Sequence, residues 1–145
     1  MREEIIMIRF LVGEKGHGKT KQLVELAQER RNTAKGSLVF IERDNSHRHE
    51  LHYSVRHVET KSFPLSNYRE FIGFICGILS QDNDIEEIFV CGYAKVVQDT
   101  SNESLVKMVK KLDELSKINS VNFTISMTAT VEDLPEEVRE LVVSI

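Results

Sequence analysis

The sequence predicts an α/β fold of three layers, in which helices cover both faces of a mostly parallel, about five-stranded sheet. Short apolar runs typical of buried strands alternate along the chain with longer segments of helical periodicity. Such alternation favours βαβ units, whose parallel sheets are covered on both faces. The length of 145 residues and the apolar content of 41% suit a single domain, residues 1–145.

The first half of the chain is expected to supply three strands and one helix. Gly13 ends the first apolar run, and Leu23, Leu26, Ala27 and Arg30 then recur at helical spacing. In chain order we expect a strand over 4–12, a helix over 19–31, a strand over 37–42, a polar loop over 43–54 and a short strand over 55–59.

In the second half, capping boxes mark two helix starts, one at Thr100 with Glu103 and one at Asp133 with Glu136. The segment 67–81 is apolar on nearly every side, so we expect a helix buried on more than one face. In order we expect a helix over 67–81 with close backbone approach at Gly73 and Gly77, a strand over 85–92, a helix over 100–118, an alternating strand over 121–130, a short helix near 135 and a final strand in "ELVVSI". The order of these strands in the sheet remains open.

Composition excludes several classes of function. The net charge of −4 gives no overall basic field, so no nucleic-acid footprint is expected. No segment approaches a membrane span of about 20 apolar residues, and the N-terminal run lacks the pattern of a signal peptide, so we expect a cytoplasmic protein. Cys76 and Cys91 have no CxxC spacing, which argues against a disulfide framework or a structural zinc site. Cys76 is expected to be a small buried hydrophobe.

The stretch "GEKGHGKT" carries the strongest chemical signal. Gly13, Gly18, Lys19 and Thr20 satisfy G-x-x-x-x-G-K-[ST] between a predicted strand and a predicted helix, and Gly16 adds a further glycine. Glycines let consecutive backbone N–H groups surround an anion, and the following helix directs its positive end to the same place. Lys19 can reach β- and γ-phosphates, and the Thr20 hydroxyl can bind Mg²⁺.

The motif predicts a nucleotide site whose ligands are ATP and Mg²⁺. ATP is preferred to GTP because no N/T-K-x-D element is present. Lys19 is also expected to act catalytically, Thr20 is the expected metal ligand, and His17 is expected at a variable, exposed position. The residues expected to bind the nucleotide are Gly13, Glu14, Lys15, Gly16, His17, Gly18, Lys19, Thr20 and Lys21.

Four segments together resemble a group of small, stand-alone bacterial P-loop proteins, largely uncharacterised and sometimes labelled after the twitching-motility retraction ATPase. They are "GEKGHGKTKQLVELA", "SLVFIERDN", "FIGFICGILSQDNDIEEIFVCG" and "NFTISMTA". The resemblance covers about residues 6–140 and implies a P-loop NTPase fold and ATP binding. It does not imply motor activity, because 145 residues leave no room for the additional domain of those motors.

Hydrolysis is in doubt because Cys91 stands where similar proteins end a core strand with Asp. A thiol is a poor ligand for a hard cation. Glu42, Asp44 and Asp99 are substitute carboxylates, each with an ordinary solvated loop residue as the alternative.

Thr128, with Ser126 as second choice, is a candidate catalytic sensor of the γ-phosphate. The alternative is that both are polar positions of an alternating strand. The histidine-rich stretch "HRHELHYSVRH" fits no structural zinc spacing, so a solvated loop is favoured over a metal site. Arg43, Arg48 or Arg56 is a candidate contact for a phosphate or a neighbouring subunit.

Three functions are compatible with these features. The favoured one is an ATP-binding NTPase or nucleotide switch that is slow or activated by a partner. The alternatives are a small-molecule kinase acting on a nucleoside and a non-hydrolysing nucleotide-binding module, because the motif specifies phosphate binding rather than a reaction. A homo-oligomer or a protein partner remains open.

Overall fold

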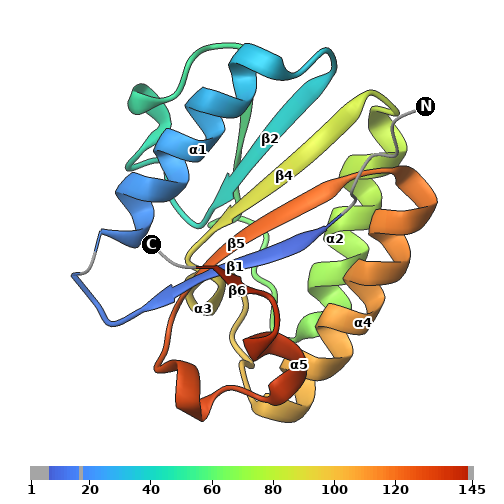
Figure 1. The fold of residues 1–145 in the computed structure, drawn as a ribbon. Helices are drawn as coiled ribbons and strands as arrows, with labels where there is room; N and C mark the ends of the chain where they lie inside the picture. Colours follow the sequence, from blue (N-terminus) through green and yellow to red (C-terminus); the bar gives the residue numbers. More distant parts are fainter. Residues whose placement is uncertain (1–6, 17, 144–145) are drawn as a thin grey trace, which may run out of the picture.

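The computed structural model describes residues 7–16 and 18–143 and contains a six-stranded, wholly parallel sheet between helices (Figure 1). The expectation of about five strands was one too few, since both short runs, at 55–59 and near the C-terminus, form strands. The strands are β1 (Ile8–Gly13), β2 (Ser37–Glu42), β3 (Val55–Glu59), β4 (Ile85–Cys91), β5 (Asn122–Thr128) and β6 (Val142–Val143). The helices are α1 (Lys19–Thr33), α2 (Tyr68–Gln81), α3 (Tyr93–Val96), α4 (Asn102–Asn119) and α5 (Glu136–Arg139), with 3₁₀ turns η1 (Arg48–Glu50) and η2 (Val131–Asp133).

The strand order, which the sequence left open, is β3-β2-β4-β5-β1-β6. β5 therefore lies between β1 and β4, and β2 lies on the far side of β4. Because all neighbours run parallel, the carboxyl ends of β1, β2, β4 and β5 meet at one edge of the sheet.

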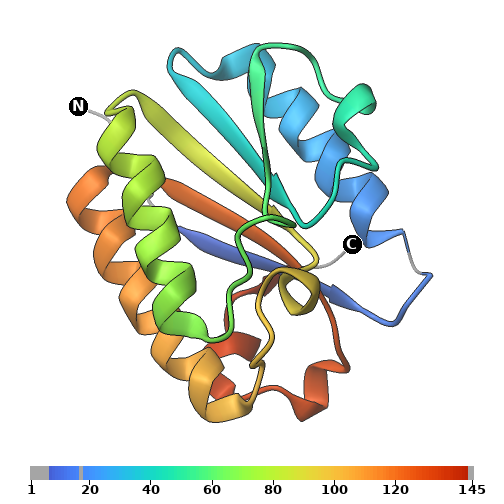
Figure 2. The ribbon, with the colours of Figure 1, turned by 180° about the vertical axis from the view of Figure 1, so that it is seen from behind.

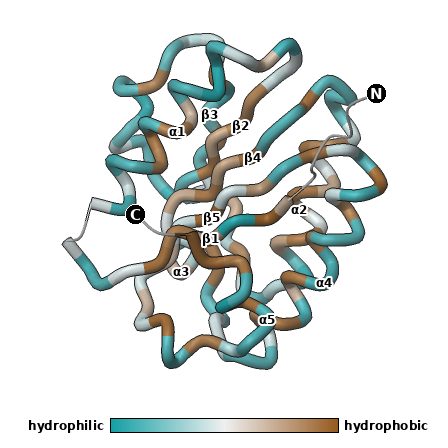
Figure 3. Tube along the Cα trace, in the orientation of Figure 1, coloured by the Kyte–Doolittle hydropathy of each residue, from teal (hydrophilic) through white to brown (hydrophobic). Residues whose placement is uncertain are grey.

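Helices cover the two faces of the sheet unequally (Figures 1 and 2). α1 packs on one face over an apolar cluster that includes Leu23, Phe40 and Phe89. α2 and α4 lie side by side on the other face, over a larger cluster that includes Phe10 and Phe123. Figure 3 shows hydrophobic residues gathered in the central strands between these layers. None of the helices in the described part of the chain is both long and apolar enough to cross a membrane.

The environment of α2 differs from the expectation of burial on several faces. Only Phe71, Ile75 and Ile78 are buried, which is the single stripe of an ordinary surface helix. Gly73 and Gly77 have no atom within 4 Å of an added Cβ, so no backbone approaches them closely. Cys76 lies on the same outer side and is exposed, so its predicted burial was wrong.

Both predicted capping boxes were wrong in detail. The cap of α4 is Ser101, one residue after Thr100, and its hydroxyl accepts a hydrogen bond from the Ser104 amide. α5 begins after Pro135 without a side-chain cap, because Asp133 belongs to the preceding turn η2. The helices themselves are where they were expected. α4 begins within two residues of position 100, and α5 lies in the region of residue 135.

A buried carboxylate lies near the amino-terminal ends of the strands, on the face of the sheet that α1 covers. Glu87 on β4 is only 2% exposed. It accepts hydrogen bonds from Thr124 Oγ1 at 2.7 Å, Arg30 Nε at 3.1 Å and Arg9 Nη2 at 3.4 Å. The polar side of the alternating strand β5 is thus buried as well. Thr124 on that side donates its hydrogen bond to Glu87 rather than to water.

We expect Glu87→Gln to lower the free energy of unfolding by about 2 kcal/mol, because it removes the buried carboxylate that Arg9 and Arg30 share and leaves Arg30 with only its ion pair to Glu86. Glu103→Gln is the matched control. Glu103 pairs with Lys107 on the surface of α4 and is 80% exposed, so its loss should cost less than about 0.5 kcal/mol. Urea unfolding of both variants measures the difference, and equal losses would contradict the structural role of Glu87.

Candidate functional site

The glycine-rich loop joins β1 directly to α1 at the carboxyl edge of the sheet. Gly16 has φ of 90° and Gly18 has φ of 79°, in the left-handed region that side-chain-bearing residues avoid. Gly18 is also the N-cap of α1, so the backbone of the loop lies at the positive end of that helix. The predicted position of His17 lies outside the described residues.

Lys19 begins α1 and turns back over the loop. Its side-chain Nζ donates to the Glu14 carbonyl at 2.8 Å, and the residue is 8% exposed. Burial, followed by the positive charge of Lys95, lowers the pKa of Lys19. An anion placed here would find a desolvated ammonium group already oriented by the loop.

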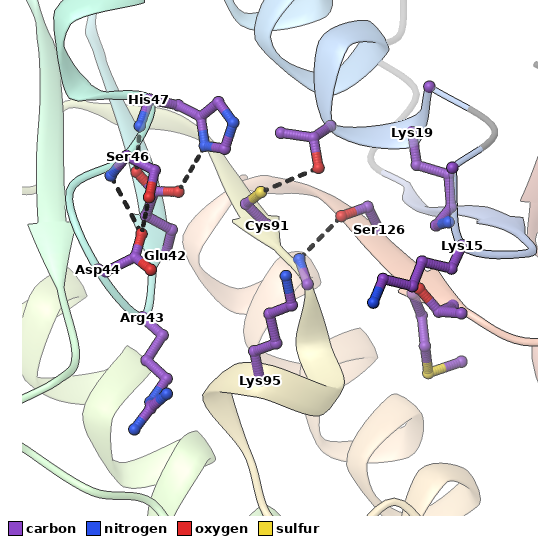
Figure 4. Close-up of a pocket in the computed structure, with 16 residues that line it drawn as sticks. Lys15, Lys19, Glu42, Arg43, Asp44, Ser46, His47, Cys91, Lys95 and Ser126 are labelled. Atoms are coloured by element: carbon purple, nitrogen blue, oxygen red, sulfur yellow. Dashed lines mark hydrogen bonds and ion pairs between the residues drawn. The ribbon is translucent and has the colours of Figure 1, made fainter.

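A cavity of about 330 Å³ opens between this loop and the ends of β2, β4 and β5 (Figure 4). Four cationic side chains line it: Lys15, Lys19, Arg43 and Lys95. Lys95 extends into the cavity from α3, whereas Arg43 points away from Cys91 and His47. The positive charge gathered at this edge suits a phosphate-bearing ligand, although the whole chain is acidic.

Of the residues expected to bind the nucleotide, Lys15, Gly16, Gly18, Lys19 and Thr20 line this cavity. Gly13 ends β1 directly before the loop, and Glu14 in the loop contributes the carbonyl that accepts the hydrogen bond from Lys19. Lys21 is exposed on the first turn of α1. The nucleotide contacts of these residues remain predictions.

Cys91 lies where the sequence placed it, at the end of β4 and close to Thr20. Its Sγ is 3.9 Å from Thr20 Oγ1. Burial raises the pKa of the Cys91 thiol, and Glu42 raises it further. The end of β4 beside Thr20 therefore holds sulfur, which does not fit a hard cation such as Mg²⁺.

Glu42 is the substitute carboxylate that reaches the site. It ends β2 beside Cys91 and is 4% exposed. His57 Nε2 and the His47 amide approach Glu42 Oε1 at 2.9 and 3.0 Å, and His47 Nδ1 lies 2.9 Å from Oε2. Glu42 is thus a buried acceptor enclosed by two histidines.

The other two substitute carboxylates have different positions. Asp44 lies at the cavity rim, where its side chain accepts hydrogen bonds from the amide and hydroxyl of Ser46, and these bonds lower the pKa of Asp44. Asp99 accepts from Ser101 and Ser104 at the start of α4 and does not line the cavity.

Ser126 and Thr128, the two sensor candidates, both line the cavity from β5. Ser126 is buried, and its hydroxyl accepts a hydrogen bond of 2.8 Å from the Gly92 amide, which fixes the turn after Cys91. Thr128 is exposed and lies opposite Gly13 in the strand register. Of the two, Thr128 has the hydroxyl at the open end of the strand, and its catalytic role remains a prediction.

The histidine-rich stretch is a solvated loop only in part, since His49 is exposed, as predicted, whereas His47 and His57 contact Glu42. The His57 side chain is 4% exposed on β3, and His47 points toward Cys91 (Figure 4). His52 instead contacts Ser54 and the exposed ring of Tyr53. Arg48 and Arg56 line a separate hollow with Tyr53, so Arg43 alone of the three predicted arginines lines the main cavity.

Sequence reasoning missed Lys95 and the pairing of Glu42 with His47 and His57. Lys95 had a weak signal, since it follows a glycine after a predicted core strand at the edge where ligands bind. The pairing of Glu42 with the histidines had no signal in the sequence, because it depends on β3 lying beside β2.

Comparisons with known proteins support the fold. Neither protein-family models nor curated proteins give a sequence match. Among solved structures, the chain is similar to the flagellar accessory protein FlaH from Methanocaldococcus jannaschii, with a TM-score of 0.50 and 13% identity over 91% of this chain. The match spans 64% of the FlaH chain, less than two thirds of its length. With the loop between β1 and α1, the chain has a three-layer P-loop NTPase fold. The resemblance to small bacterial P-loop proteins remains a prediction.

The two cysteines are expected to react with a thiol reagent at very different rates. Cys76 is exposed, whereas Cys91 is 7% exposed and its raised pKa leaves less thiolate, the reactive form, at any given pH. Ellman's reagent at pH 8 should modify one thiol rapidly and the second at least tenfold more slowly. Cys76→Ser should remove the fast phase, and a fast phase that persists in this variant would contradict the burial of Cys91.

Proposed function

We propose that the chain is an ATP-binding P-loop protein that acts as a slow or partner-activated NTPase or nucleotide switch. The observation that carries this proposal is the arrangement of Gly16, Gly18 and Lys19 at the positive end of α1, beside a cavity lined by further cations. Such a loop binds phosphates through backbone N–H groups and a lysine, and it leaves the base to other loops. ATP rather than GTP follows from the missing N/T-K-x-D element.

In this proposal Lys19 leaves the Glu14 carbonyl and binds the β- and γ-phosphates, and Lys15 and Lys95 add positive charge around them. Mg²⁺ carried by the nucleotide would neutralise phosphate charge, with the Thr20 hydroxyl as its ligand from the loop. Thr128, which lines the cavity at the end of β5, is proposed to contact the γ-phosphate or its water.

Slow turnover is proposed because the carboxylate that would activate water already accepts hydrogen bonds from other residues. Glu42 is the buried carboxylate nearest the cavity, but His47 and His57 already occupy both of its oxygens. Because both oxygens already accept hydrogen bonds, a water molecule in the cavity must compete with these histidines for the carboxylate. A protein partner, or a second copy of the chain, that rearranges the loop of His47 would remove this restraint.

A non-hydrolysing nucleotide-binding module is the second candidate, and Cys91 is the observation that favours it. The thiol lies 3.9 Å from Thr20, in the place of a strand-end carboxylate. Without that carboxylate the protein supplies fewer hard ligands to a nucleotide-bound Mg²⁺.

Lys19→Ala should weaken ATP binding about 10- to 100-fold, since it removes a charge-assisted contact worth about 1.5–3 kcal/mol. Isothermal titration calorimetry with Mg²⁺ and ATP measures this loss. Lys110→Ala is the control, because Lys110 is an exposed residue of α4 remote from the cavity. Absence of ATP and GTP binding by the wild type would refute the proposal.

Cys91→Asp should raise Mg²⁺-dependent phosphate release from ATP at least tenfold, because it restores an oxygen ligand beside Thr20. Cys91→Asn is the matched control of nearly equal shape without the charge. Loss of the gained activity on adding Lys19→Ala would assign it to this site. Wild-type turnover that Lys19→Ala abolishes would eliminate the non-hydrolysing candidate.

A further inference from the structure

Three side chains of different chemistry converge beside the P-loop. One carboxylate oxygen of Glu42, one ring nitrogen of His47 and the sulfur of Cys91 all lie within 4.8 Å of one another. Glu42 and Cys91 are opposite each other at the ends of neighbouring strands, and His47 comes from the loop after β2. The sequence conceals this group, because its spacing of 42, 47 and 91 fits no metal-binding motif.

The donor set defines the class of cation that would bind. Thiolate, imidazole and carboxylate are together the ligands of Zn²⁺ and similar divalent transition metals, whereas Mg²⁺ takes oxygen ligands in octahedral geometry. Three protein ligands with a fourth position left open are typical of a non-structural zinc site. The Cys91 thiol, a poor ligand for Mg²⁺, is therefore a suitable ligand for a softer cation.

The distances allow closure by side-chain adjustment. Bonds of about 2.0–2.3 Å in a tetrahedral site separate the ligand atoms by about 3.3–3.8 Å. Glu42 Oε2 and His47 Nδ1, now 2.9 Å apart, would separate by a few tenths of an ångström on this geometry, and Sγ would move inward by up to about 1.3 Å. His47 is partly exposed on its loop, so its ring has room to turn.

Supporting contacts already orient the carboxylate. His57 lies behind Glu42 with its side chain 4% exposed and Nε2 2.9 Å from Oε1, which leaves Oε2 directed at His47. Partners of this kind around a metal ligand fix its orientation and raise its affinity. The open side of the group faces Thr20 and the cavity.

We propose that Glu42, His47 and Cys91 form a three-ligand site for a divalent transition-metal cation of the Zn²⁺ class, with the open coordination position facing the P-loop cavity. The Cys91 Sγ–H proton passes to solvent as the sulfur–metal bond forms, and the proton that His47 Nδ1 shares with Glu42 Oε2 leaves that nitrogen, so that His47 binds as the Nε2–H tautomer. The negative carboxylate and thiolate offset the charge of the cation against Lys19 and Lys95 nearby. This site goes beyond the proposed nucleotide binding, because the protein alone supplies its three ligands.

Cobalt titration of the full chain without nucleotide tests the site. Co²⁺ should give a thiolate-to-metal charge-transfer band and the visible bands of a tetrahedral complex, saturating at one equivalent. One equivalent of Zn²⁺ should abolish these bands, and excess Mg²⁺ should not. A wild-type protein without the charge-transfer band, or displacement by Mg²⁺ as effective as by Zn²⁺, would overturn the proposal.

Variants assign the ligands. Cys91→Ser should remove the charge-transfer band, His47→Ala should weaken Co²⁺ binding at least tenfold, and His57→Ala should weaken it about 10- to 100-fold. Cys76→Ser and His52→Ala are matched controls that should bind as the wild type does. A band lost in Cys76→Ser, or kept in Cys91→Ser, would place the metal elsewhere and refute the site.

Two further measurements keep the outcome clear. Circular dichroism establishes that each variant is folded, and His47→Ala, a loop substitution outside the core, provides the test if Cys91→Ser unfolds. Lys19→Ala should keep the Co²⁺ charge-transfer band and bind Co²⁺ at least as tightly as the wild type does, because a nearby positive charge is removed, while ATP binding weakens about 10- to 100-fold. Failure of nucleotide binding and failure of metal binding are therefore separate results.

Discussion

Parallel pairing with β5 inserted between β1 and β4 is the constraint that sets the geometry of the site. The ladder places Thr128 opposite Gly13 and Glu42 opposite Cys91, so the phosphate loop and the pair Glu42–Cys91 are separated by one strand. α1 then carries Thr20 back across that strand toward Cys91. An order with more strands between β1 and β4 would have moved the thiol away from the glycine loop.

The same constraint explains which parts of the structure could be predicted. Local signals were sufficient for the glycine loop, for the α/β alternation and for Cys91 at a strand end, because each depends on residues close in sequence. Burial of the polar side of β5 could not be read from its alternation, since Thr124 and Ser126 are enclosed by partners from β4 and the turn after it. Cys76 and the glycines of α2 were misplaced for a related reason: apolar content predicts a buried helix, but only neighbouring elements decide how many of its faces are covered.

The histidines illustrate the limit most clearly. His47 and His57 lie in one polar-looking stretch, yet both contact Glu42, His57 from β3 beside β2 and His47 from the loop after β2. Burying a carboxylate is costly unless donors satisfy it. The two histidines meet this requirement, which explains why Glu42 can end a core strand at 4% exposure, and why the candidate site contains nitrogen and sulfur as well as oxygen.

Two polar centres, around Glu87 and around Glu42, occupy opposite halves of the α1 face of the sheet. Glu87 and Cys91 are four residues apart on β4, about 13 Å along the strand, and the fully buried rings of Phe40 and Phe89 lie between the centres. At such separation, free-energy changes from substitutions are usually additive. Evolution or engineering can therefore retune the ligand chemistry at one end and restore lost stability at the other, with little epistasis between the two.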